Sequence, residues 1–600
     1  MTRAVADLAL LSDCQGAALV DRDGSIEWWC APRFDSRPSF ARLLDPQAGH
    51  LRLAPAGSFH LERRYRSETL VLESTYTTET GRLRVTDALA LGAGTRGHDI
   101  GQEVPHVLAR VAECLDGEVP VELEFVPRPD FGLVRPWLMA TDSGVRTVGG
   151  PDTLALDTDL DLELARDAAR AAGTLHAGER AQVVVRHRAG YDAAPVPAGS
   201  ATAVVEETVA AWRSWTAQHQ DYDGAYAGTV RHSALILQAL TYVPTGALIA
   251  APTTSLPEIP GGDANWDYRY AWLRDASLNL RALEVGACVD EADRYLRFIA
   301  RAGSSCGVGH LPQVVFGVDG RRDLNETEVG HLAGFGGARP VRVGNAAWGQ
   351  RQLDVPGEVL DAAHRLLADG EAPIEDWMAC FLAGLADAVV DTWREDDSGI
   401  WEGREGERPY TTSKVLAWVA LDRAVRLSPR LGRHSRAERW ASERDLVRAS
   451  VLEEAWNDEM GAYAGALGSD RLDAGVLLMP LFGFLPMQDE RMRATVELIA
   501  RELGEGGVVR RWTGSEEGGF AICSFWLAEC LALAGETERA REVFEAAAAH
   551  ANDVGLMSEL IDGDGALAGN MPQAFVHAGL ISAAAAIARA EGPGGEPGAR

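Results

Sequence analysis

The sequence predicts an N-terminal antiparallel β-sandwich followed by an all-α (α/α)6 barrel. Three observations predict this architecture. Short runs that alternate apolar and polar residues, separated by turn residues, extend from about residue 16 to residue 188. After about residue 228 the apolar residues recur with a helical period instead. The connections between the predicted helices are alternately short and long, as they are when helices are paired into hairpins.

The chain of 600 residues is too long for one ordinary hydrophobic core, so at least two domains are expected. Runs such as VELEFVPRP and AQVVVRHRAGY alternate as half-buried strands do, and their number suits a large sandwich. We predict a β-sandwich domain over 1–200, a helical linker over 201–227, a barrel domain over 228–592 and a flexible tail over 593–600.

Twelve helices are predicted in the second domain. If consecutive helices run up and down, every long connection lies at the same end of the domain, and long loops in a compact domain are usually functional. A solenoid would also alternate, but its repeat length would be fixed, whereas these connections vary widely. The helices are predicted over 228–246, 275–287, 290–303, 356–369, 373–394, 411–428, 436–457, 472–482, 488–503, 519–534, 536–550 and 573–590.

The composition excludes some classes of protein. With 46% apolar and 24% charged residues the chain has the balance of a soluble globular protein. Its net charge of −31 repels nucleic-acid phosphates, so no nucleic-acid partner is expected, while a neutral substrate is compatible. We see no signal-peptide pattern and no membrane span, and the eight cysteines form no CxxC pair. A reduced, cytoplasmic protein is expected, and its oligomeric state is not determined.

The first long connection is rich in aromatic and charged residues. It reads NWDYRYAWLRD and contains Trp272, Arg274 and Asp275. Flat rings cover the apolar face of a sugar, and charged groups bind its hydroxyls with paired hydrogen bonds. The alternative is a helix start capped by Asp275 with the aromatic residues in the core. The density of polar groups among the rings favours a sugar-binding site.

The second long connection has a similar character. Asn345 and Trp348 lie in the segment RPVRVGNAAWGQ, close to a predicted helix start. The segment lacks the GK[ST] sequence and the preceding strand of a phosphate-binding loop. A second part of a sugar-binding site is therefore preferred over a nucleotide site.

Two glutamates in separate long connections are candidates for catalysis. Glu402 follows Trp401 in the third connection, and Glu559 follows Ser558 in the sixth, while Arg511 lies in the fifth. Hydrolysis of a glycosidic bond needs one group that protonates the leaving oxygen and one that takes a proton from water. If the long connections meet at one end of the barrel, the two carboxyl groups can share one pocket.

Other chemistries have little support in the sequence. The histidines at 310, 331, 364 and 577 lie in separate segments without HxxxH or HExxH spacing, so neither a metal site nor a cofactor is expected. A GxSxG motif for a serine hydrolase is also missing.

Several of these segments together resemble glycoside hydrolase family 15, the family of glucoamylases, glucodextranases and bacterial or archaeal trehalases. SDCQGAALVDRDGSIEWWCAPRFDS resembles the start of the N-terminal β-sandwich of its prokaryotic members. TTSLPEIPGGDANWDYRYAWLRDA, RPVRVGNAAWGQRQLDVPGEVLDAA, SGIWEGREGERPYTTSKVLAWVALDRA and GNMPQAFVHAGLI resemble its barrel segments, in the same order.

The resemblance implies an inverting, exo-acting glycosidase that releases β-glucose from α-glucosides. Glu402 matches the general acid and Glu559 the general base, which must be ionised. Trp272, Arg274 and Asp275 match the group that binds the terminal glucose, with Arg511 as a second binding arginine and Trp348 beside the leaving group. The chain departs from the family pattern at Leu560, where Glu or Gln is usual, and in a shortened stretch after Arg511.

The substrate is left open between several alternatives. We first expect glucoamylase-type action on short malto- or isomalto-oligosaccharides, and as the alternative an α,α-trehalase of the same family. A disaccharide phosphorylase is a more remote alternative, because such enzymes replace the base with a phosphate site, whereas Glu559 is present. A non-catalytic carbohydrate-binding protein is the other remote alternative, and it is disfavoured because both glutamates are present.

Overall fold

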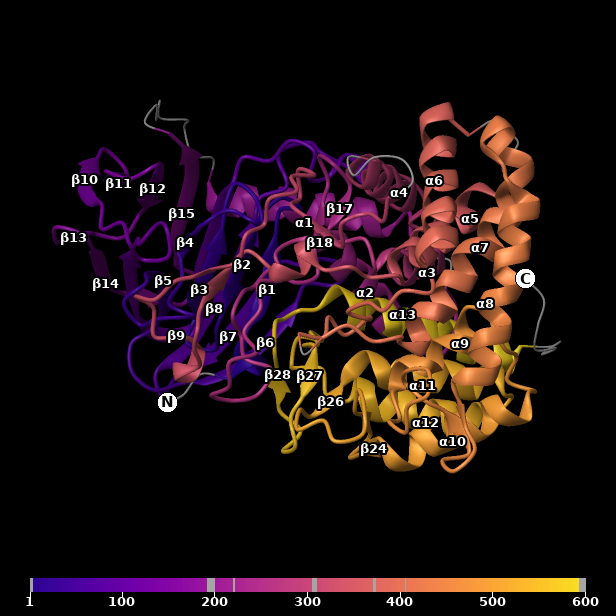
Figure 1. The fold of residues 1–600 in the computed structure, drawn as a ribbon. Helices are drawn as coiled ribbons and strands as arrows, with labels where there is room; N and C mark the ends of the chain where they lie inside the picture. Colours follow the sequence, from indigo (N-terminus) through magenta and orange to yellow (C-terminus); the bar gives the residue numbers. More distant parts are fainter. Residues whose placement is uncertain are drawn as a thin grey trace.

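A computed structural model of the chain describes residues 4–190, 200–219, 222–304, 310–368, 370, 374–404 and 406–592. Antiparallel sheets form the N-terminal part and helices the C-terminal part, and the two lie side by side (Figure 1). The predicted fold class is confirmed. The predicted flexible tail and Cys306 fall outside the described residues.

The N-terminal sheets are joined by one long strand, β9 (Val107–Val126). Its first half pairs with β8 and β15, and its second half pairs with β5 and β14. All pairings in this region are antiparallel, as the alternating sequence predicts. The other strands are β1 (Ala9–Ser12), β2 (Ala17–Val20), β3 (Ser25–Cys30), β4 (Pro38–Phe40), β5 (His50–Pro55), β6 (His60–Tyr65), β7 (Leu72–Thr77), β8 (Gly81–Leu89), β10 (Trp137–Thr141), β11 (Gly144–Val148), β12 (Asp152–Thr158), β13 (Glu163–Leu164), β14 (Ala169–His176) and β15 (Arg180–Ala189).

The helical domain is a closed double ring. Helices α3, α5, α7, α9, α11 and α13 contact one another in turn, and α13 returns to α3, so the inner ring closes. Helices α2, α4, α6, α8, α10 and α12 pack outside it. After the linker helix α1 (Ala201–Thr216), the helices are α2 (Ala227–Ala239), α3 (Ala276–Val285), α4 (Val289–Ser304), α5 (Val355–Leu367), α6 (Asp376–Thr392), α7 (Thr411–Leu431), α8 (Ala437–Glu454), α9 (Leu478–Leu481), α10 (Glu490–Glu502), α11 (Ala521–Leu533), α12 (Thr537–Ala548) and α13 (Ala574–Glu591).

Each predicted barrel helix has a counterpart, but two differ in length. The helix expected over 228–246 ends at Ala239, because the chain then turns into the hairpin of β16 (Thr241–Tyr242) and β17 (Ala247–Leu248). The helix expected over 472–482 is a 3-10 turn (Ala474–Leu477) followed by the single turn of α9. Sequence periodicity does not reveal such short irregular pieces.

The inner helix α13 is the one described helix long and apolar enough, by length and composition alone, to cross a membrane. Its most apolar window is 78% buried inside the protein. A helix that is apolar on all sides is typical of the core of a large protein, because neighbours cover every face. Its apolar sequence is thus explained by its place in the inner ring.

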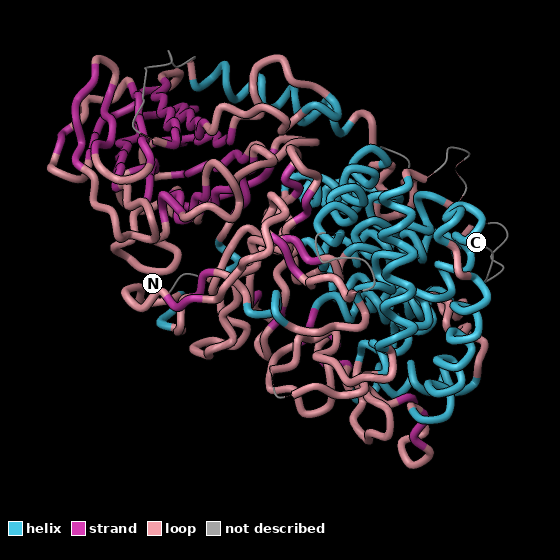
Figure 2. Tube along the Cα trace, turned by 45° about the horizontal axis from the view of Figure 1, so that its top comes forward, coloured by secondary structure: helices cyan, strands magenta, loops and turns pink. Residues whose placement is uncertain are grey.

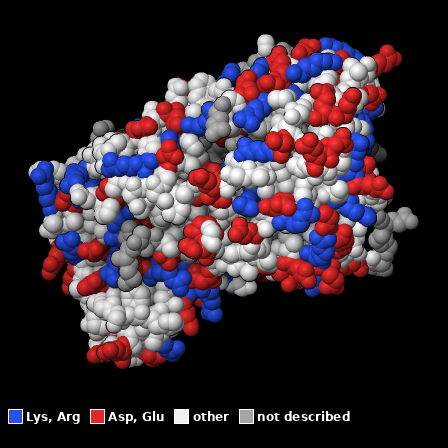
Figure 3. All heavy atoms as spheres, turned by 60° about the horizontal axis from the view of Figure 1, so that its bottom comes forward, with Lys and Arg blue, Asp and Glu red and all other residues white. Residues whose placement is uncertain are grey.

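The long loops of the barrel gather on the side that faces the N-terminal sheets (Figure 2). The Trp28 indole of β3 donates a hydrogen bond to the carbonyl of Pro252 in the first long loop, at 2.9 Å. Elsewhere the surface mixes charges of both signs, and Figure 3 shows acidic and basic side chains interleaved on one face. The loop end is therefore partly supported by the N-terminal domain.

Gly117 marks the place where β9 passes from one sheet to the next. Its φ is 66°, and a methyl group there would lie 2.1 Å from the carbonyl oxygen of Thr80. We predict that Gly117→Ala lowers the free energy of unfolding by about 3 kcal/mol, because the strained backbone and the clash add. The control Gly178→Ala has a φ of 86° and open space around it, and should cost only about 1 kcal/mol. Urea denaturation compares the two, and equal losses would contradict the packing argument.

Candidate active site

A pocket of about 470 Å³, partly open to solvent, lies among the loops at one end of the barrel. Six of the residues predicted from the sequence line it: Trp272, Arg274, Asp275, Trp401, Glu402 and Arg511. The remaining lining residues are Ala250, Tyr268, Ile400, Phe520, Gln573 and Phe575.

Glu402 is held in a tight turn of the third long loop. Its φ is 56°, and its amide donates to the carbonyl of Gly399 at 3.0 Å while its carbonyl accepts from the Gln350 amide at 3.1 Å. A left-handed backbone costs a non-glycine residue about 1–3 kcal/mol and is typical of functional sites. One carboxylate oxygen, Oε1, accepts from Trp272 Nε1 at 2.6 Å and from Arg274 Nη1 at 2.8 Å. The carboxyl group is therefore fixed in direction at the pocket wall.

Arg274 connects the carboxyl groups of this wall. Besides Glu402 it binds the Ile400 carbonyl at 3.0 Å and Asp275 Oδ1 at 3.3 Å. Burial works against its charge, but Glu402, Asp275 and Asp354 outweigh burial and raise its pKa. Burial also raises the pKa of Asp275 to about 6, against the opposing charge of Arg274. Asp275 begins α3 yet makes no capping hydrogen bond with its side chain, so its carboxyl faces the pocket rather than the helix.

Glu559 lies deeper than Glu402, next to the pocket. It directly precedes β27 (Leu560–Ile561), and its carbonyl accepts from the amide of Ala521 at 3.1 Å. Its side chain is almost fully buried; Oε1 accepts from the Tyr268 hydroxyl at 2.6 Å, and Oε2 has no hydrogen-bond partner among the described residues. A methyl group at Gly569 would lie 2.9 Å from Oε2, so the glycine avoids a close contact with this buried oxygen.

Two aromatic rings stand between the two glutamates. Tyr268, which binds Glu559, and Trp272, which binds Glu402, pack edge to face with ring centroids 5.4 Å apart. The carboxyl groups are thus not in contact with each other. A wall of two rings with an acid at each end suits a sugar ring held between the acids.

The prediction that Glu559 is ionised disagrees with its environment in the free protein. Burial, and then the nearby charge of Glu258, raise the pKa of Glu559 well above its usual range, despite the Tyr268 hydroxyl and the Arg511 charge. Burial also raises the pKa of Glu258. The two acids interact, so each makes it harder for the other to lose its proton.

Arg511 compensates part of this negative charge. It binds Glu258 at 2.9 Å and Glu517, and its guanidinium lies 5.8 Å from the ring centroid of Trp401. The Trp401 indole in turn donates to Asp473 Oδ1 at 2.9 Å. The shortened stretch after Arg511 therefore still places this arginine in the pocket wall.

Two predicted binding residues take other places. Asn345 is buried, its side-chain oxygen accepts from the Ala347 amide at 2.9 Å, and its side-chain nitrogen donates to the Asp267 carbonyl at 3.2 Å. Because both polar atoms of its side chain form hydrogen bonds inside the protein, Asn345 supports the first loop rather than lining the pocket. Trp348 is half-buried in a 3-10 turn (Ala346–Gly349) and does not line the pocket in this structure.

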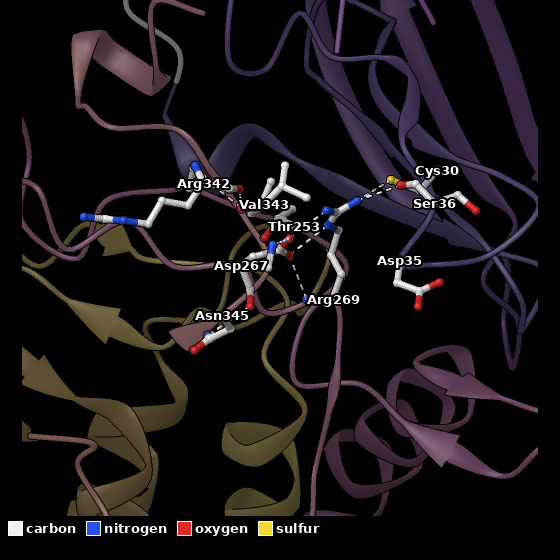
Figure 4. Close-up of polar contacts among 12 residues, drawn as sticks. Cys30, Asp35, Ser36, Thr253, Asp267, Arg269, Arg342, Val343 and Asn345 are labelled. Atoms are coloured by element: carbon white, nitrogen blue, oxygen red, sulfur yellow. Dashed lines mark hydrogen bonds and ion pairs between the residues drawn. The ribbon is translucent and has the colours of Figure 1, made fainter. Parts of the chain in front are cut away.

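A buried ion pair anchors the first loop against the N-terminal domain (Figure 4). Arg269 donates to both carboxylate oxygens of Asp267, at 2.8 and 2.7 Å, and to the carbonyl of Ser36 at 2.7 Å. Gly344 donates its amide to Asp267 at 3.2 Å. Burial opposes the charge of Arg269, but Asp267 outweighs burial and raises its pKa. Tyr268 lies between these two residues and reaches Glu559.

Tyr268, Glu258 and Gln573 were missed by the sequence reasoning. All three lie in segments quoted for their resemblance, but aromatic and glutamate side chains in loops give no local signal for their direction. The alternation of Asp267, Tyr268 and Arg269 could have indicated that Tyr268 faces away from the buried pair.

Comparison with known proteins gives a consistent result for the whole chain. A sequence model of glycosyl hydrolases family 15 matches residues 224–585, and a model described as trehalase-like, N-terminal, matches residues 2–212. A protein named trehalase from Mycolicibacterium smegmatis is 39% identical over 98% of this chain and 92% of its own length. One from Thermoplasma volcanium is 30% identical over 95% of this chain and 91% of its own.

A solved structure shares the fold. The crystal structure of a bacterial glucoamylase complexed with acarbose matches with a TM-score of 0.73 over 98% of this chain and 94% of the other, at 13% sequence identity. Together these findings define the protein as a glycosidase with an (α/α)6 barrel. The chain belongs to glycoside hydrolase family 15.

The anchor of the first loop leads to a prediction about stability. Asp267→Asn leaves the fully buried Arg269 without its counter-charge, so we expect the free energy of unfolding to fall by about 3–5 kcal/mol. The exposed Asp263→Asn in the same loop is the control and should change it by less than about 0.5 kcal/mol. Denaturant unfolding measures both, and an unchanged Asp267→Asn protein would contradict the anchoring role.

Proposed function

We propose that the protein is an inverting α,α-trehalase, in which Glu402 is the general acid and Glu559 the general base. The supporting observation is that relatives named trehalase are 30% and 39% identical along nearly the whole chain, including the N-terminal domain. They favour the alternative of the sequence analysis over its first expectation, glucoamylase-type action. The match with the glucoamylase structure, at 13% identity, supports the fold alone.

The pocket is compatible with a small neutral sugar. Its wall combines charged side chains with aromatic rings, as sugar-binding sites do. Arg274 and Asp275 offer charged groups that bind vicinal hydroxyls, and Trp272 offers a flat face. We propose that these three residues bind the glucose unit whose bond is cut.

In the proposed reaction Glu402 donates a proton to the glycosidic oxygen as its bond to the anomeric carbon breaks. A water molecule attacks that carbon from the opposite face and passes a proton to Glu559. The products are two glucose molecules, and the two glutamates exchange protonation states until solvent resets them. Tyr268 and Trp272 hold the two carboxyl groups apart, which gives the water its place.

The substrate assignment is tested with trehalose, maltose, isomaltose and maltotriose, each with and without inorganic phosphate. We expect release of free glucose from trehalose with a kcat/KM at least about tenfold above the other sugars, and no glucose phosphate. A higher kcat/KM on maltose or isomaltose than on trehalose would refute the trehalase assignment, but the protein would still be a glycosidase. Phosphate-dependent formation of glucose 1-phosphate would point to a phosphorylase.

The roles of the two acids are tested by substitution. Glu402→Gln and Glu559→Gln should each lower kcat on trehalose by about 10²–10⁴-fold, because each removes one proton transfer. Circular dichroism should show the folded protein in both. Glu516→Gln, an exposed glutamate of the fifth loop, is the control and should keep its kcat. Near-normal turnover by either active-site variant would refute its assignment.

The environment of Glu559 predicts a pH effect. The base must be deprotonated, so kcat/KM should fall on the acid side as pH drops through the raised pKa of the Glu258 and Glu559 pair. Glu258→Gln removes a negative neighbour, which favours the charged form of Glu559 and lowers its pKa. The acid limb of kcat/KM should therefore move to lower pH than in the wild type. An acid limb that does not move, or that moves to higher pH, would contradict the proposed interaction between Glu258 and Glu559.

A further inference from the structure

A group of possible metal ligands lies where three distant segments meet, outside the pocket. His98 belongs to a 3-10 turn of the N-terminal domain (Gly97–Asp99), His219 follows the linker helix α1, and Glu291 is in the first turn of the barrel helix α4. One ligand atom from each lies within 4.8 Å of the others. None of them lines the pocket or contacts the residues proposed for catalysis.

The ring of His219 is oriented with one nitrogen free. Its Nδ1 lies 2.7 Å from the Trp215 carbonyl oxygen, so this nitrogen carries the hydrogen and donates it. The ring also stacks on Trp215, with centroids 4.1 Å apart. The other nitrogen, Nε2, then presents a lone pair. A backbone carbonyl that fixes the tautomer in this way is typical of histidines that bind metal ions.

The free nitrogen faces a carboxylate oxygen that is also free. His219 Nε2 lies 3.4 Å from Glu291 Oε2, and neither atom has a hydrogen-bond partner in the described part of the chain. The side chains of His219 and Glu291 are only 1% and 4% exposed, so water does not satisfy them easily. Two buried acceptors that face each other need a positive charge between them, either a proton or a cation.

The rest of the cluster favours a divalent cation. Glu291 Oε1 lies 2.9 Å from His98 Nδ1 and also accepts from Trp215 Nε1 at 2.9 Å. Asp290 Oδ2 lies 3.0 Å from the other ring nitrogen, His98 Nε2, on the far side of the ring. Two neutral imidazoles and the Glu291 carboxylate form a donor set with one negative charge, which suits a divalent cation. Nitrogen and oxygen ligands in this mixture suit Zn²⁺, whose bonds to them are about 2.0–2.2 Å long.

To bind a zinc ion, the ligand atoms of the three residues need to move only a short distance closer together. Tetrahedral ligands at zinc-bond lengths lie about 3.4 Å apart, so the 4.8 Å spread must shrink by about 1–1.5 Å. His98 is the member able to move, because its side chain is 30% exposed and it lies in a single short turn. Gly97 allows that turn to lie close to Gln218 after α1, since a methyl group there would come within 2.8 Å of its amide.

We propose that His98, His219 and Glu291 bind a structural Zn²⁺ ion that fastens the N-terminal domain and the linker helix to the barrel. The ion would join segments separated by 121 residues between His98 and His219 (219 − 98) and by 72 between His219 and Glu291 (291 − 219). Spacing rules do not detect such a site, because no two of its three ligands lie within one helix or loop.

The test is the metal content and thermal stability of the full-length protein. We expect about one Zn²⁺ per chain by plasma mass spectrometry after purification from zinc-supplemented medium. Removal with a chelator should lower Tm by at least about 3 °C, and ZnCl₂ but not MgCl₂ should restore it. Purified wild-type protein that holds no zinc, and whose Tm does not respond to added ZnCl₂, would overturn the proposal.

Variants separate this site from adventitious binding. His98→Gln, at the partly exposed ligand, and His219→Gln should both lose the bound zinc and the response of Tm to ZnCl₂. His176→Gln, at an exposed histidine of the N-terminal domain, is the matched control and should keep both. If His98→Gln folds and binds zinc like the wild type, the proposal is overturned even where His219→Gln fails to fold.

Discussion

The active-site loop depends on the buried ion pair of Asp267 and Arg269. The pair is fully buried, and Arg269 reaches across to the carbonyl of Ser36 in the N-terminal domain. Between the paired residues lies Tyr268, whose hydroxyl holds Glu559. A buried ion pair gives little net stability, but it is costly to break, so it fixes one arrangement of the loop. The N-terminal domain thereby takes part in shaping a pocket that the barrel alone would leave less defined.

The inner ring of helices brings together residues that are far apart in the sequence. Because the helices alternate in direction, the first, third, fifth and sixth long loops all meet at one end and supply the pocket wall. Each acid is held differently: Glu402 by a strained turn and two donors, Glu559 by burial and one tyrosine. This asymmetry of environment lets two identical side chains take different roles.

The sequence was most informative where its signals were periodic or where several motifs agreed. Twelve helical segments and the alternation of short and long links were enough to predict the closed barrel, and four of the six long loops supply the pocket wall. The direction of individual side chains was less predictable. Asn345 was expected to line the pocket, but its side chain is hydrogen-bonded to Ala347 and Asp267. The expectation that Glu559 is ionised did not include the charge of its buried neighbour Glu258. Both depend on contacts between loops, which no local pattern contains.

The stereochemistry of the first turnovers tests the central claim most directly, namely that water attacks opposite the acid under the control of Glu559. Proton NMR of trehalose hydrolysis, recorded faster than glucose mutarotates, resolves the two anomers. Inversion at one anomeric carbon predicts equal initial amounts of α- and β-glucose. Initial release of α-glucose alone would mean retention through a covalent intermediate, and it would contradict the account.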